Sequence, residues 1–550
     1  LALNEAYIGV VRHDLAVILP LLLLLMIVVP GWLVGSVRAV IIAMPDGLGA
    51  LLAGFGLAGW LHAELAAVNS FIPVILLGIS LAGCVHMALS VIRFRQAGAA
   101  ADEAAWSSVR YNFMPMALAN GTTVLGFLGL LFSPSPPIRV LGYVVAAGIA
   151  TSFLLCMTLL PALQACFDPV PKRARSRDFR AGAFARIATR RRKAIVAVVA
   201  LLAVPAGWLA SRNVVSDNVL EYFPDTHAFH QGTALVEDRL SGITELVYVV
   251  DTLGEEGLFR ASVVESVAAF ADWLQAQPEV PRVTSLADAE PLVEARAEGR
   301  LQERLGFYRE LAQQRPGRGS PVAREVSSDF SATAVNAYLH RMGSSGLVAF
   351  DERVRVWAAD NLEGLEVTGG GPVLMFAYLG ERNVRSMLIA LTAALMLAAV
   401  VLGLSLRSWR IAAVGLACNI LPVLLVYSLW AVLKGRISLG AAVVMGMIIG
   451  IVIDDTIYLL TTYRRALAAR VADPVTHALR RVGPALIVTT ITLVASLSLG
   501  LLSDFEPIWS MSALSVAIIG LALLVDLLLL PAMLPSEARA GGRKGATGVS

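Results

Sequence analysis

Long apolar runs constrain this chain more than any other feature of its sequence. A helix needs about 20 apolar residues to cross the hydrocarbon core of a membrane, and eleven segments approach or exceed that length. They cover residues 15–34, 39–61, 71–92, 114–132, 138–166, 194–210, 385–406, 411–433, 439–463, 484–502 and 508–530. The sequence therefore predicts a polytopic α-helical membrane protein.

Composition agrees with a membrane environment. Of the 550 residues, 57% are hydrophobic and only 15% are charged, whereas soluble domains have about a quarter of their residues charged. Cys84, Cys156 and Cys418 lie inside apolar runs and Cys166 lies at the end of one. These positions offer no disulfide framework and no zinc-binding spacing, so we expect no metal and no cofactor.

The distribution of basic residues predicts the orientation of the chain. Ten Lys and Arg residues stand between positions 172 and 193. Such a block could bind nucleic acid or anionic lipid, but between apolar helices it is typical of a cytoplasmic loop. Basic loops after the third, seventh and ninth runs fall on the same side. The sequence thus indicates no nucleic-acid partner and places residues 212–384 outside the cytoplasm.

The two groups of five apolar runs repeat each other at a separation near 370 residues. The matched positions are Met114-Pro115 with Gly483-Pro484, Thr122-Thr123 with the region from Thr490 to Thr492, and Leu160-Pro161-Ala162 with Leu530-Pro531-Ala532. Agreement in run lengths, basic loops and these positions favours two pseudo-symmetric membrane repeats.

Between the repeats, the polar region alternates strand and helix patterns. Strand patterns at 244–252 and 280–284 flank a helical pattern at 262–275, and a flexible link is expected at 315–331. Strand patterns at 334–339 and 365–368 then flank a helical pattern at 345–360. Two such units are typical of an α+β, ferredoxin-like domain.

These observations divide the chain into six parts. We expect a first membrane repeat of five spans at 1–166, a basic cytoplasmic linker at 167–193 and the first helix of the second repeat at 194–211. An extracytoplasmic domain at 212–384, five further spans at 385–534 and a cytoplasmic tail at 535–550 complete the division. Counting sides places residue 1 outside, which predicts a missing first helix before it.

Two adjacent carboxylates stand in the middle of an apolar helix. Asp454 and Asp455 lie between Gly450 and Tyr458. An ionised carboxylate at that depth costs at least about 2.5 kcal/mol, so acids are rare there and are retained mainly for function. The pair predicts a proton-carrying site. The alternative is a structural pair that is hydrogen-bonded to neighbouring helices.

Hydroxyl groups on the next span are the expected partners of this pair. Thr489, Thr490, Thr492 and Ser496 lie at a similar depth, and Tyr458 lies one turn from Asp454. The same hydroxyls could instead bond to their own helix backbone. The tyrosine could join a relay or only anchor its helix.

The corresponding segment of the first repeat, residues 79–86, has no carboxylate. It ends in His86, which aligns with Tyr458. An imidazole can titrate near neutral pH and could serve a proton relay, although a histidine that only packs explains it as well.

The segment from Gly450 through Asp455 resembles the GxxxDD proton-relay motif of the RND superfamily, in particular of MMPL-type exporters and their sterol-sensing relatives. The resemblance covers nearly the whole chain. It implies two repeats of six helices, each with a porter domain after its first helix, and the region at 212–384 would be the second porter domain. The first helix and the first porter domain are what this chain lacks relative to that pattern.

The resemblance implies proton-driven export of a hydrophobic or amphipathic molecule, with a lipid as the expected cargo. It also implies a bacterial inner-membrane location, a porter domain in the periplasm and a dimer or trimer as the assembly. The alternatives are a Sec-associated accessory protein translocase and a sterol-sensing-type lipid-binding protein that does not pump. No enzyme is expected, because His227 and His230 lack a third metal ligand and Gly369-Gly370-Gly371 is not followed by a phosphate-loop lysine.

Overall fold

The computed structural model describes two compact units, one made of Leu1–Val214 with Arg382–Ser550 and one made of Val215–Glu381. The described residues are 2–169, 181–216, 222–224, 226–228, 230–232, 235, 244–254, 257–289, 306–307, 310, 325–340 and 342–535. Much of the basic block, most of the predicted link at 315–331 and nearly all of the predicted tail lie outside them.

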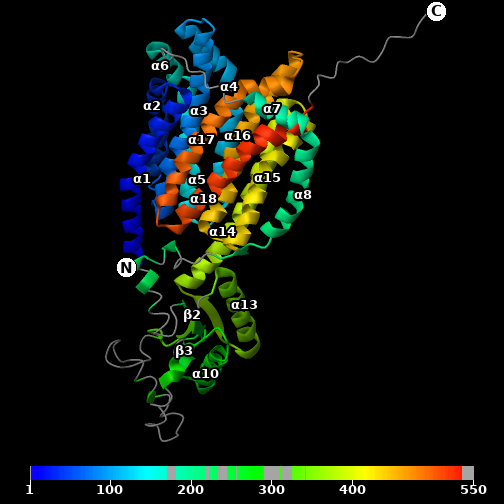
Figure 1. The fold of residues 1–550 in the computed structure, drawn as a ribbon. Coiled ribbons are helices and arrows are strands. Elements are labelled where there is room, and N and C mark those ends of the chain that lie inside the picture. The colour runs from blue at the N-terminus through cyan, green and yellow to red at the C-terminus, as the bar shows by residue number, and fades with distance from the viewer. Residues whose placement is uncertain are drawn as a thin grey trace, which may run out of the picture. The chain divides into compact units, whose positions relative to one another are not determined.

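In the described part of the chain, eleven helices are long and apolar enough to cross a membrane, which confirms the predicted number. They run side by side in Figure 1. Their bounds are α1 (Ala2–Val34), α2 (Val37–Trp60), α3 (Ile72–Gln96), α4 (Ala101–Leu128), α5 (Pro136–Met157), α8 (Arg192–Ala210), α14 (Pro372–Leu406), α15 (Trp409–Leu433), α16 (Leu439–Ala468), α17 (Pro474–Ser498) and α18 (Glu506–Leu524).

Short elements join these helices. They are η1 (Ala67–Phe71), η2 (Gly129–Phe132), α6 (Leu159–Phe167), α7 (Ala181–Arg190), β1 (Val214–Val215), β6 (Arg436–Ile437), η6 (Leu499–Leu502), η7 (Val525–Leu529) and α19 (Leu530–Met533).

The fifth span is interrupted, so the predicted continuous helix at 138–166 is wrong. Helix α5 ends at Met157, and α6 begins at Leu159. Pro161 explains the break, because a proline ring clashes with the carbonyl four residues earlier, which here belongs to Met157. In the second group of helices, Pro531 follows the π-helical turn η7 in the same way. A proline therefore disturbs the end of the last helix in both groups.

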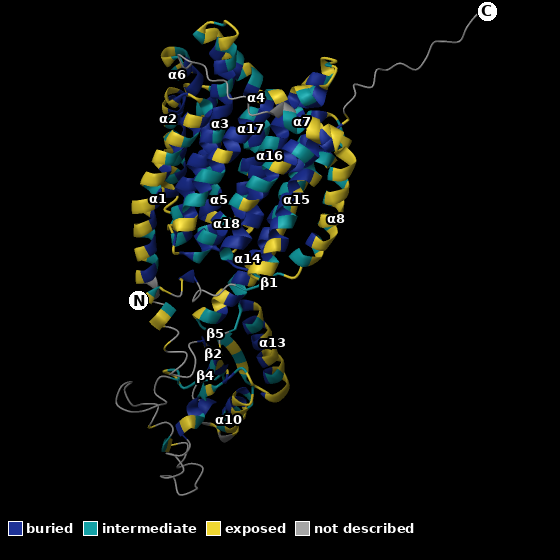
Figure 2. Cartoon of the chain, in the orientation of Figure 1, coloured by how far each residue is buried: buried dark blue, intermediate teal, exposed yellow. Residues whose placement is uncertain are grey.

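The acid-bearing helix α16 lies at the centre of the first unit. In its most apolar window 89% of the residues are buried, against 6% for α8, and Figure 2 shows this contrast. Helix α16 packs against α4, α17 and α18, and α3 packs against α17. The sequence alone cannot distinguish a central helix from a peripheral one when both are apolar on every side.

The second unit is an antiparallel sheet with two helices. In chain order its elements are β2 (Thr244–Asp251), η4 (Gly257–Phe259), α10 (Ala261–Gln275), β3 (Arg282–Thr284), η5 (Leu286–Ala289), β4 (Ala332–Leu339), α13 (Ser344–Asn361) and β5 (Glu366–Gly370). The strand order is β3-β4-β2-β5. Strand β2 pairs with β4 from Thr244 opposite Leu339 to Asp251 opposite Ala332.

The core of this unit forms because strand side chains alternate between two faces. Leu246, Tyr248 and Val250 of β2 are buried, while the residues between them are more exposed. They pack in one cluster with Phe270 of α10 and Phe350 of α13. The strands and helices predicted at 244–284 and 334–368 are all present within about three residues of their expected bounds, and a further helical stretch expected to end near residue 314 lies mostly outside the described residues.

Glu325 makes the stability of the second unit depend on pH. Burial, helped by the nearby Asp288 carboxylate, raises the pKa of Glu325 from 4.5 to about 7. Between these values the folded unit binds more protons than the unfolded chain, so the free energy of unfolding falls as pH rises. We expect the Glu325→Gln variant not to show this decrease in the free energy of unfolding.

Hydrogen exchange of the β2 and β4 amides in the full chain would measure this effect. The wild-type protein and the Glu325→Gln variant should be protected to a similar degree near pH 4.5, whereas the variant should be better protected at pH 8. An equal difference between the two proteins at both pH values would contradict the prediction.

Candidate functional site

The two adjacent carboxylates of α16 face a small cavity inside the helix bundle. Its volume is about 50 Å³, and residues of α3, α4, α16, α17 and α18 line it. Because one water occupies roughly 10–15 Å³ on this scale, the cavity has room for a few water molecules. Asp454, Asp455, Tyr458, Thr490 and His86 are all in its lining.

Each carboxylate accepts a hydrogen bond from a threonine on a different helix. Thr490 of α17 donates its hydroxyl to Asp455 Oδ2 at 2.9 Å. Thr123 of α4 lies 3.1 Å from Asp454 Oδ1, and its hydroxyl is also within reach of the Gly450 and Ala119 carbonyls at 2.7 and 2.9 Å. A threonine has one hydroxyl proton, so Thr123 can donate to only one of these acceptors at a time. A protonated Asp454 could instead donate to Thr123, and the arrangement thus accommodates both protonation states.

Glycine packing brings Thr123 to Asp454. A Cβ atom on Gly450 would lie 3.0 Å from Thr123 Cα, and one on Gly126 would lie 3.3 Å from Gly450 Cα. Helices α4 and α16 can approach this closely only because small residues line their contact. The glycine of the GxxxDD pattern therefore positions a partner for the first of its two aspartates.

We expect Gly450→Ala to lower the thermal stability of the protein. The added methyl group must push α4 away from α16, at a cost of about 1–3 kcal/mol, which exceeds the roughly 1 kcal/mol gained in helix propensity. The displacement would also lengthen the contact between Thr123 and Asp454. The unfolding midpoint of the purified protein should therefore fall.

Gly121→Ala is the matched control on α4, because a Cβ atom there meets nothing within 4 Å. It should leave thermal stability unchanged or slightly improved. Equal behaviour of the two alanine variants would show that the close approach has no role.

His86 and Tyr458, which occupy matched positions in the two groups of helices, lie in contact. Their rings stack with centroids 3.9 Å apart and an interplanar angle of 2°. Both are nearly buried and line the cavity beside the carboxylates. The contact is compatible with both of the roles that the sequence left open for each residue.

The other predicted hydroxyls divide into two groups. Thr489 lines the cavity, but its hydroxyl lies 3.0 Å from both the Ala485 and the Leu486 carbonyl of its own helix and can donate to either. Thr492 donates to the Val488 carbonyl and Ser496 to the Thr492 carbonyl, both at 2.8 Å. Neither Thr492 nor Ser496 lines this cavity. Of the four predicted hydroxyls, Thr490 is therefore the one that bonds to a carboxylate of the pair.

Sequence reasoning missed Thr123 and a third acid, Asp526. Thr456 donates its hydroxyl to Asp526 Oδ1 at 2.8 Å and lies 3.3 Å from Asn419 Oδ1. Both missed residues left a signal. Thr123 belongs to the Thr122-Thr123 pair that matches the region from Thr490 to Thr492 in the second group of helices, and Asp526 interrupts an apolar run as Asp454 does.

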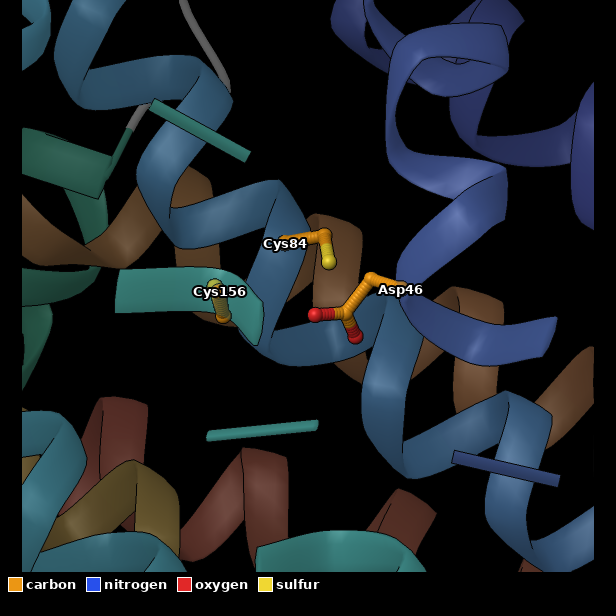
Figure 3. A group of neighbouring side chains, drawn as sticks. All are labelled: Asp46, Cys84 and Cys156. Atoms are coloured by element: carbon orange, nitrogen blue, oxygen red, sulfur yellow. The ribbon is translucent and has the colours of Figure 1, made fainter. Parts of the chain in front are cut away.

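A further acid lies beside two cysteines in the first group of helices. Figure 3 shows Asp46, Cys84 and Cys156 converging from α2, α3 and α5. The segment at 79–86 has no carboxylate of its own, but the fold supplies one from a neighbouring helix.

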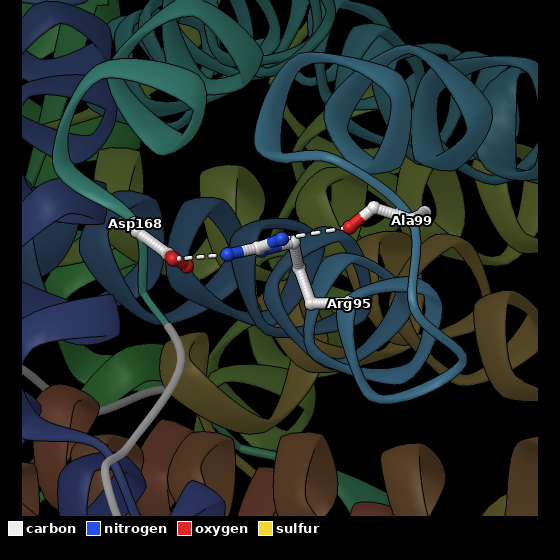
Figure 4. A network of polar contacts seen from close by, with 3 residues as sticks. All are labelled: Arg95, Ala99 and Asp168. Carbon is white, nitrogen blue, oxygen red and sulfur yellow. Dashed lines mark hydrogen bonds and ion pairs between the residues drawn. The ribbon is translucent and has the colours of Figure 1, made fainter.

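An ion pair near the end of α3 has a structural role. Arg95 Nη2 lies 2.7 Å from Asp168 Oδ2, and Arg95 Nη1 donates to the Ala99 carbonyl at 2.7 Å, as Figure 4 shows. Asp168 has a φ angle of +32°, a region that non-glycine residues seldom adopt. Both side chains are partly exposed, so solvent screens the pair, and its main role is to hold the turn after α6.

Comparison with known proteins agrees with this architecture. A model of the MMPL family matches residues 3–199 and 224–548. The chain belongs to the MMPL family. Among curated proteins, none matches this chain. This MMPL protein is thus a multi-pass membrane protein of the RND type, as the GxxxDD segment indicated.

Two solved structures resemble this MMPL protein in fold. One is the hedgehog release protein Disp from the water bear Hypsibius dujardini, with a TM-score of 0.68 and 13% identity over 95% of this chain. The other is SecDF in its super-membrane-facing form, with a TM-score of 0.57 and 12% identity over 96% of this chain. The matches span 70% of Disp and 61% of SecDF. At such low identity they establish a shared fold.

Proposed function

We propose that this MMPL protein is an exporter that couples proton movement through Asp454 and Asp455 to the transport of a hydrophobic or amphipathic molecule, with a lipid as the expected cargo. One observation carries the proposal. Two adjacent carboxylates in a central membrane helix face a cavity with room for water, and each has its own threonine partner. A purely structural pair would need no water-sized space beside it.

The proposed cycle depends on the change in charge at this pair. An ionised carboxylate strongly attracts water and hydroxyl donors in a low-dielectric site, whereas a protonated one can itself donate a hydrogen bond. Thr123 belongs to α4 and Thr490 to α17, so a change of protonation alters contacts between α16 and two other helices. This gives a proton a direct means of changing how the helices pack.

Two pseudo-symmetric membrane repeats form part of this proposal. Helix α4 packs on α16 as α3 packs on α17, and α2 packs on α5 as α15 packs on α18. Each of these contacts has its counterpart when the two groups of helices are exchanged. Such symmetry supports alternating access around the cavity, which lies between helices of both groups.

We further propose that residues 212–384 form a ferredoxin-like porter domain. The strand order β3-β4-β2-β5, with α10 between β2 and β3 and α13 between β4 and β5, is the order expected of a split βαβ unit. The basic loops support a periplasmic position for this domain and a bacterial inner-membrane location. Assembly as a dimer or trimer remains a prediction.

The alternatives differ in cargo and in energy coupling. SecDF shares the fold, and a polypeptide cargo would make this chain a Sec-associated accessory translocase. A lipid sensor that does not pump would have no need for the paired carboxylates. Proteoliposomes that contain a fluorescent phospholipid and an imposed pH gradient test the exporter directly, because phospholipid movement should require both the gradient and the aspartates.

A further inference from the structure

Three potential metal ligands meet in the interior of the first unit, apart from the cavity described above. Asp46 comes from α2, Cys84 from α3 and Cys156 from α5. One ligand atom of each lies within 4.8 Å of the others, and the three residues are 2%, 1% and 1% exposed. Figure 3 shows the Cys84 sulfur and the Asp46 carboxylate directed toward each other.

The Asp46 carboxylate is only half satisfied. Ser152 donates its hydroxyl to Asp46 Oδ2 at 2.6 Å. Asp46 Oδ1 is buried and has no hydrogen-bond partner among the described residues. Leaving a carboxylate oxygen unpaired in a low-dielectric interior is costly, so an additional cation or donor would stabilise it.

The second group of helices has a polar cluster at the matched places. Cys84 and Thr456 are 372 positions apart, and Cys156 and Asp526 are 370 apart. In that second cluster a hydroxyl donates to the carboxylate, from Thr456 to Asp526 Oδ1 at 2.8 Å. In the first cluster thiols occupy these two places. A thiol is a poor hydrogen-bond donor but, once deprotonated, a strong metal ligand.

We propose that Asp46, Cys84 and Cys156 bind a zinc ion. Two thiolates favour zinc or monovalent copper, and the hard carboxylate oxygen favours zinc of these two. Three anionic ligands carry a charge of −3, which Zn²⁺ reduces to −1 and Cu⁺ only to −2. The smaller residual charge costs less in the membrane interior. Ser152 would orient the carboxylate through its other oxygen, as partners of metal ligands commonly do.

The three ligand atoms need to move only slightly closer together to bind a zinc ion. Zinc bonds of about 2.3 Å to sulfur and 2.0–2.2 Å to oxygen place ligand atoms roughly 3.4–3.8 Å apart. The present separations of at most 4.8 Å exceed this range by no more than about 1.4 Å. The ion would join α2, α3 and α5 within the first group of helices, while the proposed proton pair lies on α16.

Metal analysis of the full-length protein, purified in detergent from cells grown with zinc, tests the proposal. We expect about one zinc per chain, lost in Cys84→Ser and in Cys156→Ser and retained in Cys418→Ser, which removes a buried cysteine of α15. Ser152→Ala should weaken zinc affinity about 10- to 100-fold in competition with a chelator. Cobalt substituted for zinc in the wild-type chain should give a sulfur-to-cobalt charge-transfer band, which does not depend on any variant folding.

Several outcomes would overturn the proposal. One is wild-type protein that binds neither zinc nor cobalt after chelator treatment and reloading. Another is zinc content that is the same in Cys84→Ser, Cys156→Ser and wild type. A third is non-reducing mass analysis that finds Cys84 and Cys156 joined as a disulfide, because the cluster would then be an oxidised cross-link in place of a metal site.

Discussion

Replacing Asp454 or Asp455 with asparagine is expected to abolish pH-gradient-driven transport while the protein still folds. An amide has nearly the shape of a carboxyl group, can still accept the hydrogen bond from Thr123 or Thr490, and cannot release a proton. Removing a potential charge from an apolar helix should not destabilise the fold. In proteoliposomes with a fluorescent phospholipid and a pH-sensitive dye in the lumen, both phospholipid transfer and proton flux should fall to the level of empty liposomes.

Two further variants make this result specific. Glu103→Gln removes an exposed carboxylate of α4 and should leave both signals unchanged. His86→Gln, at the ring that stacks on Tyr458, should reduce transport much less than either aspartate variant. Unchanged proton flux in both asparagine variants would refute the relay. A third outcome is proton flux in the wild-type protein that is lost in both asparagine variants, with no phospholipid transfer by any of the proteins. This result would support the proton relay and indicate a cargo other than phospholipid, such as a polypeptide.

Cysteines placed in the second unit are expected to react completely with a membrane-impermeant thiol reagent, and cysteines in the predicted cytoplasmic loops are expected not to react. Ser262 is exposed on α10, and Ala469 is exposed in the loop after α16. The block of Lys and Arg before α8 should hold that end of the helix in the cytoplasm, so α8 carries the chain outward. Intact cells with a permeabilised outer membrane should therefore label Ser262→Cys and exclude Ala469→Cys.

The cysteine background for this experiment follows from the structure. Cys166 is exposed and should be replaced by serine, whereas Cys84, Cys156 and Cys418 are buried and can remain. Disrupting the cells before labelling should make Ala469→Cys reactive, which shows that the loop is accessible once the membrane is open. If only Ala469→Cys were labelled in intact cells, the second unit would lie in the cytoplasm and the direction of export would have to be reversed.

The sequence alone determined the number of spans, the strand and helix order of the second unit, and the position of the acid pair. These features depend on residues close together in the chain. An apolar run of about 20 residues by itself predicts a membrane-spanning helix. The alternation of apolar and polar side chains in β2 by itself predicts which face of the strand is buried. Asp454 and Asp455 stand out because a carboxylate in hydrocarbon is costly wherever the rest of the chain lies.

Only the tertiary structure decided which side chains meet. Thr123 lies 331 positions before Asp454, and their contact depends on how closely α4 and α16 approach at Gly126 and Gly450. Thr490 and Thr492 look equivalent in the sequence, but rotation of α17 turns one toward the carboxylates and leaves the other bonded to its own backbone.

The cysteine cluster shows the same limit of sequence reasoning. Cys84 lies 38 positions after Asp46, and Cys156 lies 72 positions after Cys84, so no short sequence motif identifies the three residues as a group. In a membrane bundle nearly every helix is apolar on all faces, so hydrophobic periodicity carries little information about neighbours. The packing of small residues and the geometry of hydrogen bonds between helices, which only the folded chain defines, determine which polar side chains come together.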